Sequence, residues 1–283
     1  MSTLLKERLA DDAIAQIACV FSKIKPNFAS QDFIHQAQSG IHKLELKARV
    51  YYLIDVLAQY LPSDFAQTAL LLQQVPQHWS AYNTQDNYSF AAWPIIDYVA
   101  VYGLNHPDLA LHTLKTLTPL FTAEFAIRPF LQQHFDVTYG YLQQWAKDEN
   151  PHVRRLASEG CRPRLPWGQR VLYLMNNHQE IISILECLKD DDSDYVRRSV
   201  ANNLNDIGKD YPETVIDLAQ RWLAQPTTHR QWIIKHATRG LVKSGHADAL
   251  AMLGYSQKLN IKNVDFSLNK TQISMNETVQ LCC

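Results

Sequence analysis

A repeated segment in the second half of the chain is the feature that most constrains its fold. The residues ENPHVRRLASEG at 149–160 match DSDYVRRSVANN at 192–203, so Val153 recurs as Val196 after 43 positions. A weaker third copy, WIIKHATRGLVKSG at 232–245, aligns when Ile233 is placed under Val196. Repeats of about 40 residues that contain two helices are typical of HEAT-like solenoids, in which each helix pair buries its apolar side against the next.

Composition favours the same helical class for the rest of the chain. The 283 residues are 46% hydrophobic and include only nine glycines. Apolar residues recur at i, i+3 and i+4 spacing, and alternating apolar/polar runs are scarce. We therefore expect an all-α protein, with a HEAT-like α-solenoid domain over residues 1–255. The segment 88–102 is aromatic and apolar nearly all round, which predicts a helix buried between neighbours.

The last residues of the chain have a different pattern. Apolar residues alternate at Leu259 and Ile261 and again at Phe266 and Leu268. This period of two predicts short β-strands. We therefore predict a second, β-prone segment over residues 256–283.

The repeat predicts which residues of each helix face outward. Projection of residues 194–207 at 100° per residue places Val196, Val200, Leu204 and Ile207 on the buried side. The same projection places an outward set away from that side. This set consists of Arg198, Asn202, Asn205 and Asp206, and its equivalents in the other copies are Arg155 with Glu159 and Lys235 with Arg239. Side by side, these positions predict a basic stripe with a few isolated acids, which suits a phosphate backbone.

The distribution of charge is more informative than its total. The formal net charge is −1, yet no Asp or Glu occurs from 219 to 247, where five basic residues lie. The window 150–170 holds five arginines and one acid, Glu159, around Trp167. Guanidinium groups bind phosphates, and an indole can stack on a sugar or a base. The structural alternative is a solvated amphipathic helix followed by a loop.

Glu124 and Arg128 are spaced as i and i+4 in FTAEFAIRPFL. On a helix this spacing favours a surface ion pair.

Other classes of site have little support in the sequence. The five cysteines are odd in number and have no CxxC spacing near histidines, which fits neither a disulfide framework nor a zinc site. The N-terminus lacks the apolar core of a signal peptide, and no run reaches the roughly 18 apolar residues that a membrane helix needs. We therefore expect a cytoplasmic protein with no metal, no cofactor and no membrane span.

Three motifs together resemble one known family. NPHVRRLASEGCRPRLPWG, FTAEFAIRPFL and DYVRRSVANNLNDIGKDYP resemble the AlkC branch of the HEAT-repeat DNA alkylation repair glycosylases, a group that also includes AlkD. The likeness spans residues 1–255 and is most specific over 121–212. It implies a monomeric, monofunctional glycosylase that removes cationic N3-alkylated bases, such as 3-methyladenine and 3-methylcytosine, from double-stranded DNA without a cofactor. The tail resembles the opening of the immunoglobulin-like domain of AlkC relatives. That domain needs about 100 residues, so the resemblance implies a truncated domain here.

The resemblance also implies roles for individual residues. An acidic pair and a tryptophan lie against the deoxyribose in this family, and the matching positions are Glu124, Asp206 and Trp167. Asp194, at the start of a repeat helix, is an alternative to Asp206, and its structural role would be an N-cap. The residues expected to bind DNA are Arg154, Arg155, Arg162, Arg164, Arg197, Arg198, Asn202, Lys235 and Arg239. The alternative function is a non-catalytic HEAT-repeat scaffold that binds nucleic acid or a protein partner.

Overall fold

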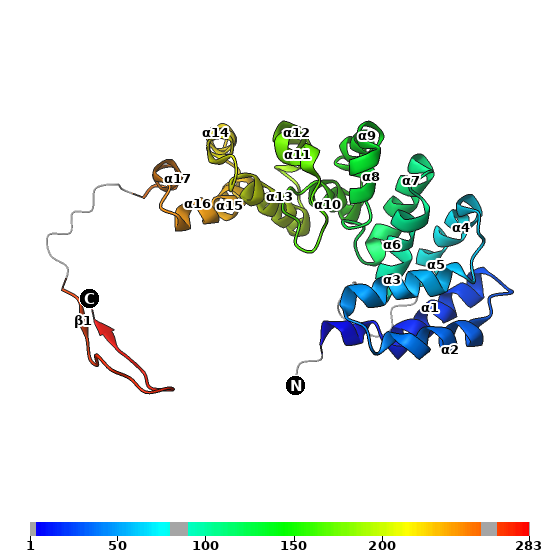
Figure 1. Cartoon of the computed structure of the whole chain (residues 1–283). Helices are drawn as coiled ribbons and strands as arrows, with labels where there is room; N and C mark the ends of the chain where they lie inside the picture. The colour runs from blue at the N-terminus through cyan, green and yellow to red at the C-terminus, as the bar shows by residue number, and fades with distance from the viewer. Residues whose placement is uncertain (1–3, 80–89, 256–264, 283) are drawn as a thin grey trace.

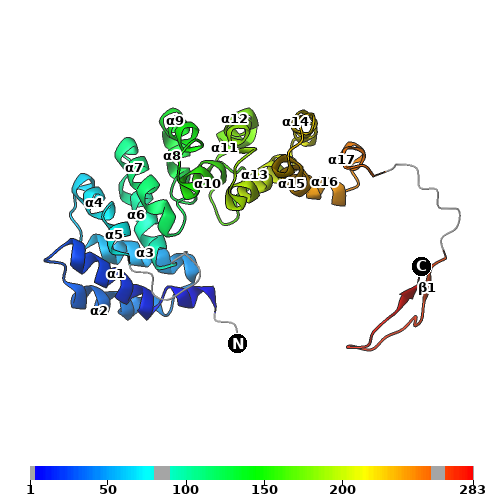
Figure 2. The same cartoon turned by 180° about the vertical axis from the view of Figure 1, so that it is seen from behind.

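The helices stack into a curved arch. The computed structural model describes residues 4–79, 90–255 and 265–282. Successive helix pairs follow the arch from its N-terminal end to α17, and the view from behind shows the same single curved row of pairs (Figures 1 and 2). This arrangement confirms the predicted all-α solenoid.

The first half of the chain forms one end of the arch. Its elements are η1 (Leu5–Arg8), α1 (Asp11–Ile24), α2 (Ser30–Ile41), α3 (Leu46–Ala58), α4 (Phe65–Leu72), α5 (Val75–His78), η2 (Phe90–Ala92), α6 (Trp93–Tyr102), α7 (Pro107–Leu117), η3 (Thr118–Leu120) and α8 (Arg128–Gln133).

The second half carries the repeats and the tail. Its elements are α9 (Phe135–Trp145), α10 (Pro151–Gly160), α11 (Leu172–Asn176), α12 (His178–Leu188), α13 (Asp194–Ile207), α14 (Pro212–Leu223), α15 (Thr228–Ala237), α16 (Arg239–Lys243), α17 (Ala247–Met252), β1 (Ser267–Leu268) and β2 (Leu281–Cys282).

The repeat helices lie next to one another on the inner side of the arch. Helix α13 packs against α10 on one side and α15 on the other, while α9, α12 and α14 lie on the outer side (Figure 1). Local sequence fixes where two of these helices begin. At the start of α10, the side chain of Asn150, which precedes Pro151, accepts a hydrogen bond from the His152 N–H. At the start of α15, the Thr227 hydroxyl accepts one from the Arg230 N–H.

The third copy of the repeat differs from the first two. The aligned stretch 232–245 is interrupted at Thr238, which separates α15 from α16. The Thr238 hydroxyl donates to the Ile234 carbonyl at 2.8 Å. The same bond occurs at Thr113 and Thr138 inside the unbroken helices α7 and α9, so it does not by itself explain the interruption.

The predicted buried face of α13 is confirmed. Val196, Val200, Leu204 and Ile207 are all buried in the core, which is shared by neighbouring helices along the arch. Helix α6 is also buried over most of its surface, as predicted, although Tyr102 at its C-terminal end is exposed.

The tail forms a small antiparallel pair. In β1 and β2, Ser267 lies opposite Cys282 and Leu268 opposite Leu281. The predicted strand that contains Leu268 is therefore present, but it is only two residues long. The other predicted strand, around Leu259 and Ile261, lies outside the described residues. Across residues 4–79, 90–255 and 265–282, no helix combines the length and apolar character needed to cross a membrane.

The stacking of α13 predicts a stability difference between two leucines. Leu204 is fully buried on α13, whereas Leu172 on α11 is 67% exposed. We expect Leu204→Ala to lower the free energy of unfolding by about 2–5 kcal/mol, because it removes buried methyl groups and leaves a cavity. Leu172→Ala should change it by less than about 0.5 kcal/mol. Urea unfolding followed by circular dichroism measures both values, and equal effects would contradict the assigned core.

Candidate active site

A line of alternating acidic and basic side chains runs across the helices on the inner side of the arch. Glu124 comes from the loop before α8, Arg155 and Glu159 come from α10, Arg162 follows α10, and Asp206 comes from α13. Their contacts are short. Arg155 lies 2.7 Å from Glu124, and Arg162 lies 2.6 Å from Glu159 and 2.8 Å from Asp206. We call these five residues the charged cluster.

The charged cluster is partly withdrawn from water. Glu124, Glu159, Arg162 and Asp206 are buried. Its three carboxylates outnumber its two guanidinium groups, and Lys209 adds a positive charge at the rim, 3.1 Å from Asp206. In such surroundings charges interact more strongly than in bulk water. A carboxylate of this cluster can therefore stabilise a positive charge that develops close to it.

Glu159 is held in its ionised form. Burial alone would raise its pKa, but Arg155, Arg162 and the Ser199 hydroxyl together leave the pKa of Glu159 below its ordinary value. Ser199 donates to Glu159 Oε2 at 2.6 Å. Glu159 was expected to point outward beside Arg155 on a solvated stripe. It is instead buried between α10 and α13, because Ser199 and Arg162 cover it.

Asp206 was likewise projected onto the outward face of its helix, and this is wrong. The side chain is buried because Arg162, from the loop after α10, covers it with bonds from Nε and Nη2. The projection treats α13 as a helix with solvent on one side. The loop after α10 occupies part of that side.

The expected ion pair between Glu124 and Arg128 does not form. Residues 121–127 are a succession of turns and not a helix, so the i, i+4 rule does not apply there. Glu124 Oε2 instead accepts from Thr122 at 2.7 Å and lies 2.7 Å from Arg155. The buried Arg128 instead forms hydrogen bonds to the backbone of the loop after α10.

Arg128 holds that loop by its backbone. Its guanidinium donates to the carbonyls of Gly160 and Arg162 at 2.8 and 3.0 Å and to the carbonyl of Gln169. Burial lowers the pKa of Arg128 to about 10, so it remains charged at neutral pH. Hydrogen bonds from a buried cation to carbonyls are stronger than neutral ones. The two ends of the loop 161–171 are thereby fixed against α8.

Trp167 occupies an unusual backbone position at the tip of this loop. The Gly168 N–H donates to the Leu165 carbonyl at 3.1 Å, which closes a four-residue turn with Pro166 in its second position. Trp167 has φ of +63°, as the third position of a type II turn requires. Glycine or asparagine normally fills that position, and another residue there costs on the order of 1–3 kcal/mol.

The strained backbone projects the indole into solvent. Trp167 is 58% exposed, and its carbonyl accepts a hydrogen bond from Lys47 Nζ of α3 at 2.5 Å. Because this large apolar side chain is exposed and its backbone is strained, it contributes little to the stability of the core. Such positions are characteristic of functional sites.

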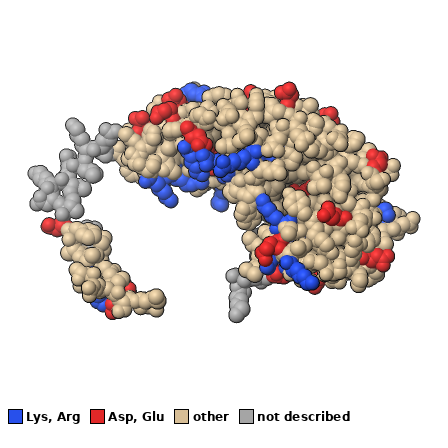
Figure 3. All heavy atoms as spheres, in the orientation of Figure 1, with Lys and Arg blue, Asp and Glu red and all other residues tan. Residues whose placement is uncertain are grey.

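Some of the residues expected to bind DNA are exposed, and others are already paired within the protein. Lys and Arg side chains gather on the inner side of the arch over α13 and α15, with a few Asp and Glu beside them, and other Asp and Glu lie along the outer rim (Figure 3). Arg198 and Lys235 are exposed there, and Arg239 donates to Asn202 at 2.9 Å. A phosphate could reach the exposed groups without breaking a buried contact.

Other arginines are already engaged. Arg154 donates to both carboxylate oxygens of Asp191, and both Arg154 and Arg197 bind the carbonyls of the loops that precede their own helices. Arg164 makes a two-pronged contact with Asp210. A phosphate would have to compete with these bonds. Arg155 and Arg162 belong to the charged cluster.

Asp194, the alternative second acid, contacts residues outside the charged cluster. It is the first residue of α13 and is half exposed, and it pairs with Arg198 at 2.8 Å. The described ranges contain no group of three or more His, Cys, Asp or Glu side chains placed to hold a metal ion.

The chain is similar to several known proteins in sequence and in fold. Residues 121–241 match the family model described as DNA alkylation repair enzyme. An uncharacterised Bacillus subtilis protein, YhaZ, is 35% identical over 277 residues, which cover 98% of this chain and 75% of that protein. The chain belongs to the DNA alkylation repair enzyme family. Its structure is also similar to that of the Pseudomonas fluorescens alkylpurine DNA glycosylase AlkC bound to DNA containing an abasic site analog. The TM-score is 0.82 and the identity 37%, over 90% of this chain and 69% of that one.

Some site features of this family member had weak signals in the sequence. Glu159 stands four residues after Arg155, which put the two on one face but did not indicate burial. Ser199 and Thr122 had no signal at all, because small hydroxyl residues are common on helix faces and in loops. The turn LPWG, in contrast, has a proline at the second position and tryptophan at the third. Because a type II turn favours glycine or asparagine at the third position, the sequence itself signals a strained residue there.

The ionised state of Glu159 predicts how stability changes with pH. Because its pKa is lowered in the folded protein, its contribution is present above the unfolded value of about 4.3 and is lost as the pH falls through the folded value. We expect Glu159→Gln to lower the free energy of unfolding at pH 7 by about 3–5 kcal/mol, because the buried Arg162 and the partly buried Arg155 each lose a partner.

The difference in free energy of unfolding between the wild type and Glu159→Gln should become smaller below about pH 4. Urea unfolding from pH 3 to 7 measures this difference. A gap independent of pH would show that Glu159 is not ionised in the folded protein.

Proposed function

We propose that this protein is a monofunctional DNA glycosylase that releases cationic N3-alkylated bases, such as 3-methyladenine and 3-methylcytosine, from double-stranded DNA. The observation that carries the proposal is the charged cluster together with the exposed Trp167, which lies on the same loop as Arg162. A passive scaffold gains nothing from burying three carboxylates or from placing a tryptophan in a strained turn. The family and the similarity to AlkC support the same activity.

The chemistry suits a site rich in carboxylates. An alkylated base already carries a positive charge, so its bond to the sugar can break without a general acid. The electron pair of that bond moves to the base and neutralises it, and the positive charge passes to an oxocarbenium-like sugar. Fixed negative groups beside that sugar lower the barrier, because they are arranged before the charge develops.

We assign separate roles to the residues. Among the described residues, the Thr122 and Arg155 contacts with Glu124 both use Oε2, so we direct Oε1 to the sugar and to the attacking water. Asp206 and Glu159 supply additional negative charge behind it. We prefer Asp206 to Asp194 as the second acid, because Arg162 connects it to Glu159. Trp167 stacks against the deoxyribose.

Base release tests these roles. We expect Glu124→Gln to slow release of 3-methyladenine from methylated duplex DNA by about 100-fold or more, since it removes a fixed charge that acts on the transition state. Binding to the same duplex should change little. The control is Asp217→Asn, which changes an exposed carboxylate on α14 and should leave both quantities unaltered.

Substitutions of Trp167 separate stacking from folding. Trp167→Ala should slow release strongly, whereas Trp167→Phe keeps an aromatic face and should retain more of the activity. Neither change should lower the melting temperature, because the indole is exposed and its backbone is strained. Salt-sensitive DNA binding with no base release by the wild type would favour the non-catalytic scaffold.

Two matched arginines test the DNA-binding face. Arg198 on inner helix α13 and Arg221 on outer helix α14 have side chains that are 66% and 65% exposed. We expect Arg198→Ala to weaken duplex binding and to reduce the slope of log K against log salt by about one, as one phosphate contact is lost. Arg221→Ala should leave the slope unchanged. Fluorescence anisotropy across a salt series measures both, and equal slopes in all three proteins would place the DNA on another face.

A further inference from the structure

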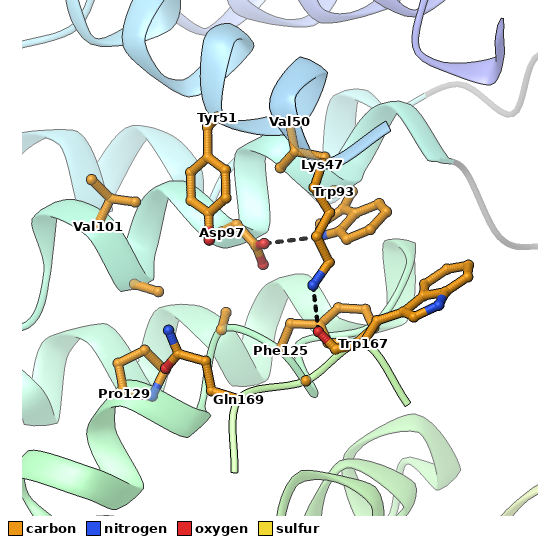
Figure 4. A pocket seen from close by; sticks show the side chains of 13 residues that line it. Lys47, Val50, Tyr51, Trp93, Asp97, Val101, Phe125, Pro129, Trp167 and Gln169 are labelled. Carbon is orange, nitrogen blue, oxygen red and sulfur yellow. Dashed lines mark hydrogen bonds between the residues drawn. The ribbon is translucent and has the colours of Figure 1, made fainter. Parts of the chain in front are cut away.

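A cavity of about 220 Å³ lies directly behind the Trp167 turn. Helices α3 and α6 form one wall, and the turn and the start of α8 form the other (Figure 4). Its lining includes the aromatic side chains of Tyr51, Trp93 and Phe125, and the Trp93 and Phe125 rings stack with centroids 5.3 Å apart. The Trp167 indole points away from this space (Figure 4).

One polar group in the cavity lacks a hydrogen-bond partner. The Asp97 carboxylate points into the space between Tyr51 and Trp93 (Figure 4). Its Oδ2 accepts from Trp93 Nε1 at 2.8 Å, while Oδ1 is buried and has no partner among the described residues. A buried acceptor left without a donor is costly. It indicates a site that a ligand with a hydrogen-bond donor would complete.

The environment of Asp97 supports the same reading. Burial raises the pKa of Asp97 to about 7, against the lowering effect of the Trp93 bond and of nearby Lys47. The negative charge of Glu124 also raises it, which means that the cavity lies within electrostatic range of the charged cluster. Burial and Asp97 in turn raise the pKa of Tyr51. A donor to Oδ1 would stabilise the carboxylate in these surroundings.

We propose that this cavity binds the free purine base after its release, with the exocyclic amine donating to Asp97 Oδ1 and the ring against the aromatic wall. The lining suits this ligand class. A flat aromatic ring fits stacking surfaces, and the exocyclic amine supplies a hydrogen-bond donor to the unfilled acceptor. The cavity lies close to Glu124 and to Trp167, since Phe125, the residue after Glu124, and the Trp167 turn both line it. The inference rests on the proposed function for the identity of the base.

The test measures binding of free 3-methyladenine, with adenine for comparison, by equilibrium dialysis without DNA. We expect the wild type to bind 3-methyladenine and Asp97→Asn to weaken binding by about tenfold or more. In the variant, the amide oxygen must accept from Trp93 Nε1. Its NH₂ group then faces the cavity and opposes the amine of the base.

Two further variants separate the cavity from general damage to the fold. Ala100→Leu leaves Asp97 in place but fills part of the cavity, and it should also weaken binding. Asp217→Asn, on the outer side of α14, should bind like the wild type. Thermal unfolding identifies any variant that fails to fold. If Asp97→Asn or Ala100→Leu fails, the binding measured for the other variant tests the cavity.

The outcomes distinguish this inference from the proposed function. No binding by the wild type, or equal binding by the wild type and both cavity variants, overturns the base site. That result would leave base release from DNA, measured separately, as evidence for a glycosylase without such a site. Binding that depends on Asp97 in a protein that releases no base from DNA would support the cavity and contradict the glycosylase.

Discussion

The Arg162 guanidinium is the interaction on which the arrangement of the charged cluster depends. It lies between Glu159 and Asp206, at 2.6 and 2.8 Å, and joins the loop after α10 to α13. Without that positive charge, two buried carboxylates on neighbouring helices would repel each other, and at least one would take up a proton. Buried ion pairs seldom add net stability over apolar residues of similar size. A function that requires ionised carboxylates gives a physical reason for keeping this one.

The loop that carries Arg162 also carries Trp167, so one segment connects the charges to the aromatic surface. Arg128 fixes both ends of the loop through backbone carbonyls, and Lys47 binds its tip. Gly168 allows the close approach, because a Cβ atom there would lie 2.7 Å from the Leu165 side chain and 3.2 Å from Arg128. These contacts oppose the strain at Trp167. They fix the indole relative to the carboxylates, and fixed geometry is what stabilisation of a developing charge requires.

The sequence predicted the features that depend on one helix at a time. Periodicity identified the solenoid and the buried face of α13, since burial of that face follows from the spacing of Val196, Val200 and Leu204. It failed where a non-helical segment intervenes. Asp206 is buried by a loop that comes from 44 residues earlier in the chain, and Glu124 lies in turns where helical spacing has no meaning. The cavity at Asp97 is built from α3, α6 and the Trp167 turn, so no local pattern could indicate it.

The state of the carboxylates bears on which bases the proposed reaction could accept. A neutral base is a poor leaving group unless an acid protonates it, and Glu159, held ionised by two arginines, cannot serve as that acid. Asp97, with its pKa near 7, could hold a proton, but it faces the cavity behind the Trp167 turn. A base that is already cationic needs no proton, and the fixed carboxylates of the cluster favour the sugar cation that remains. Selectivity for charged, damaged bases would then arise because Glu159 and Asp97 do not place a proton at the leaving base.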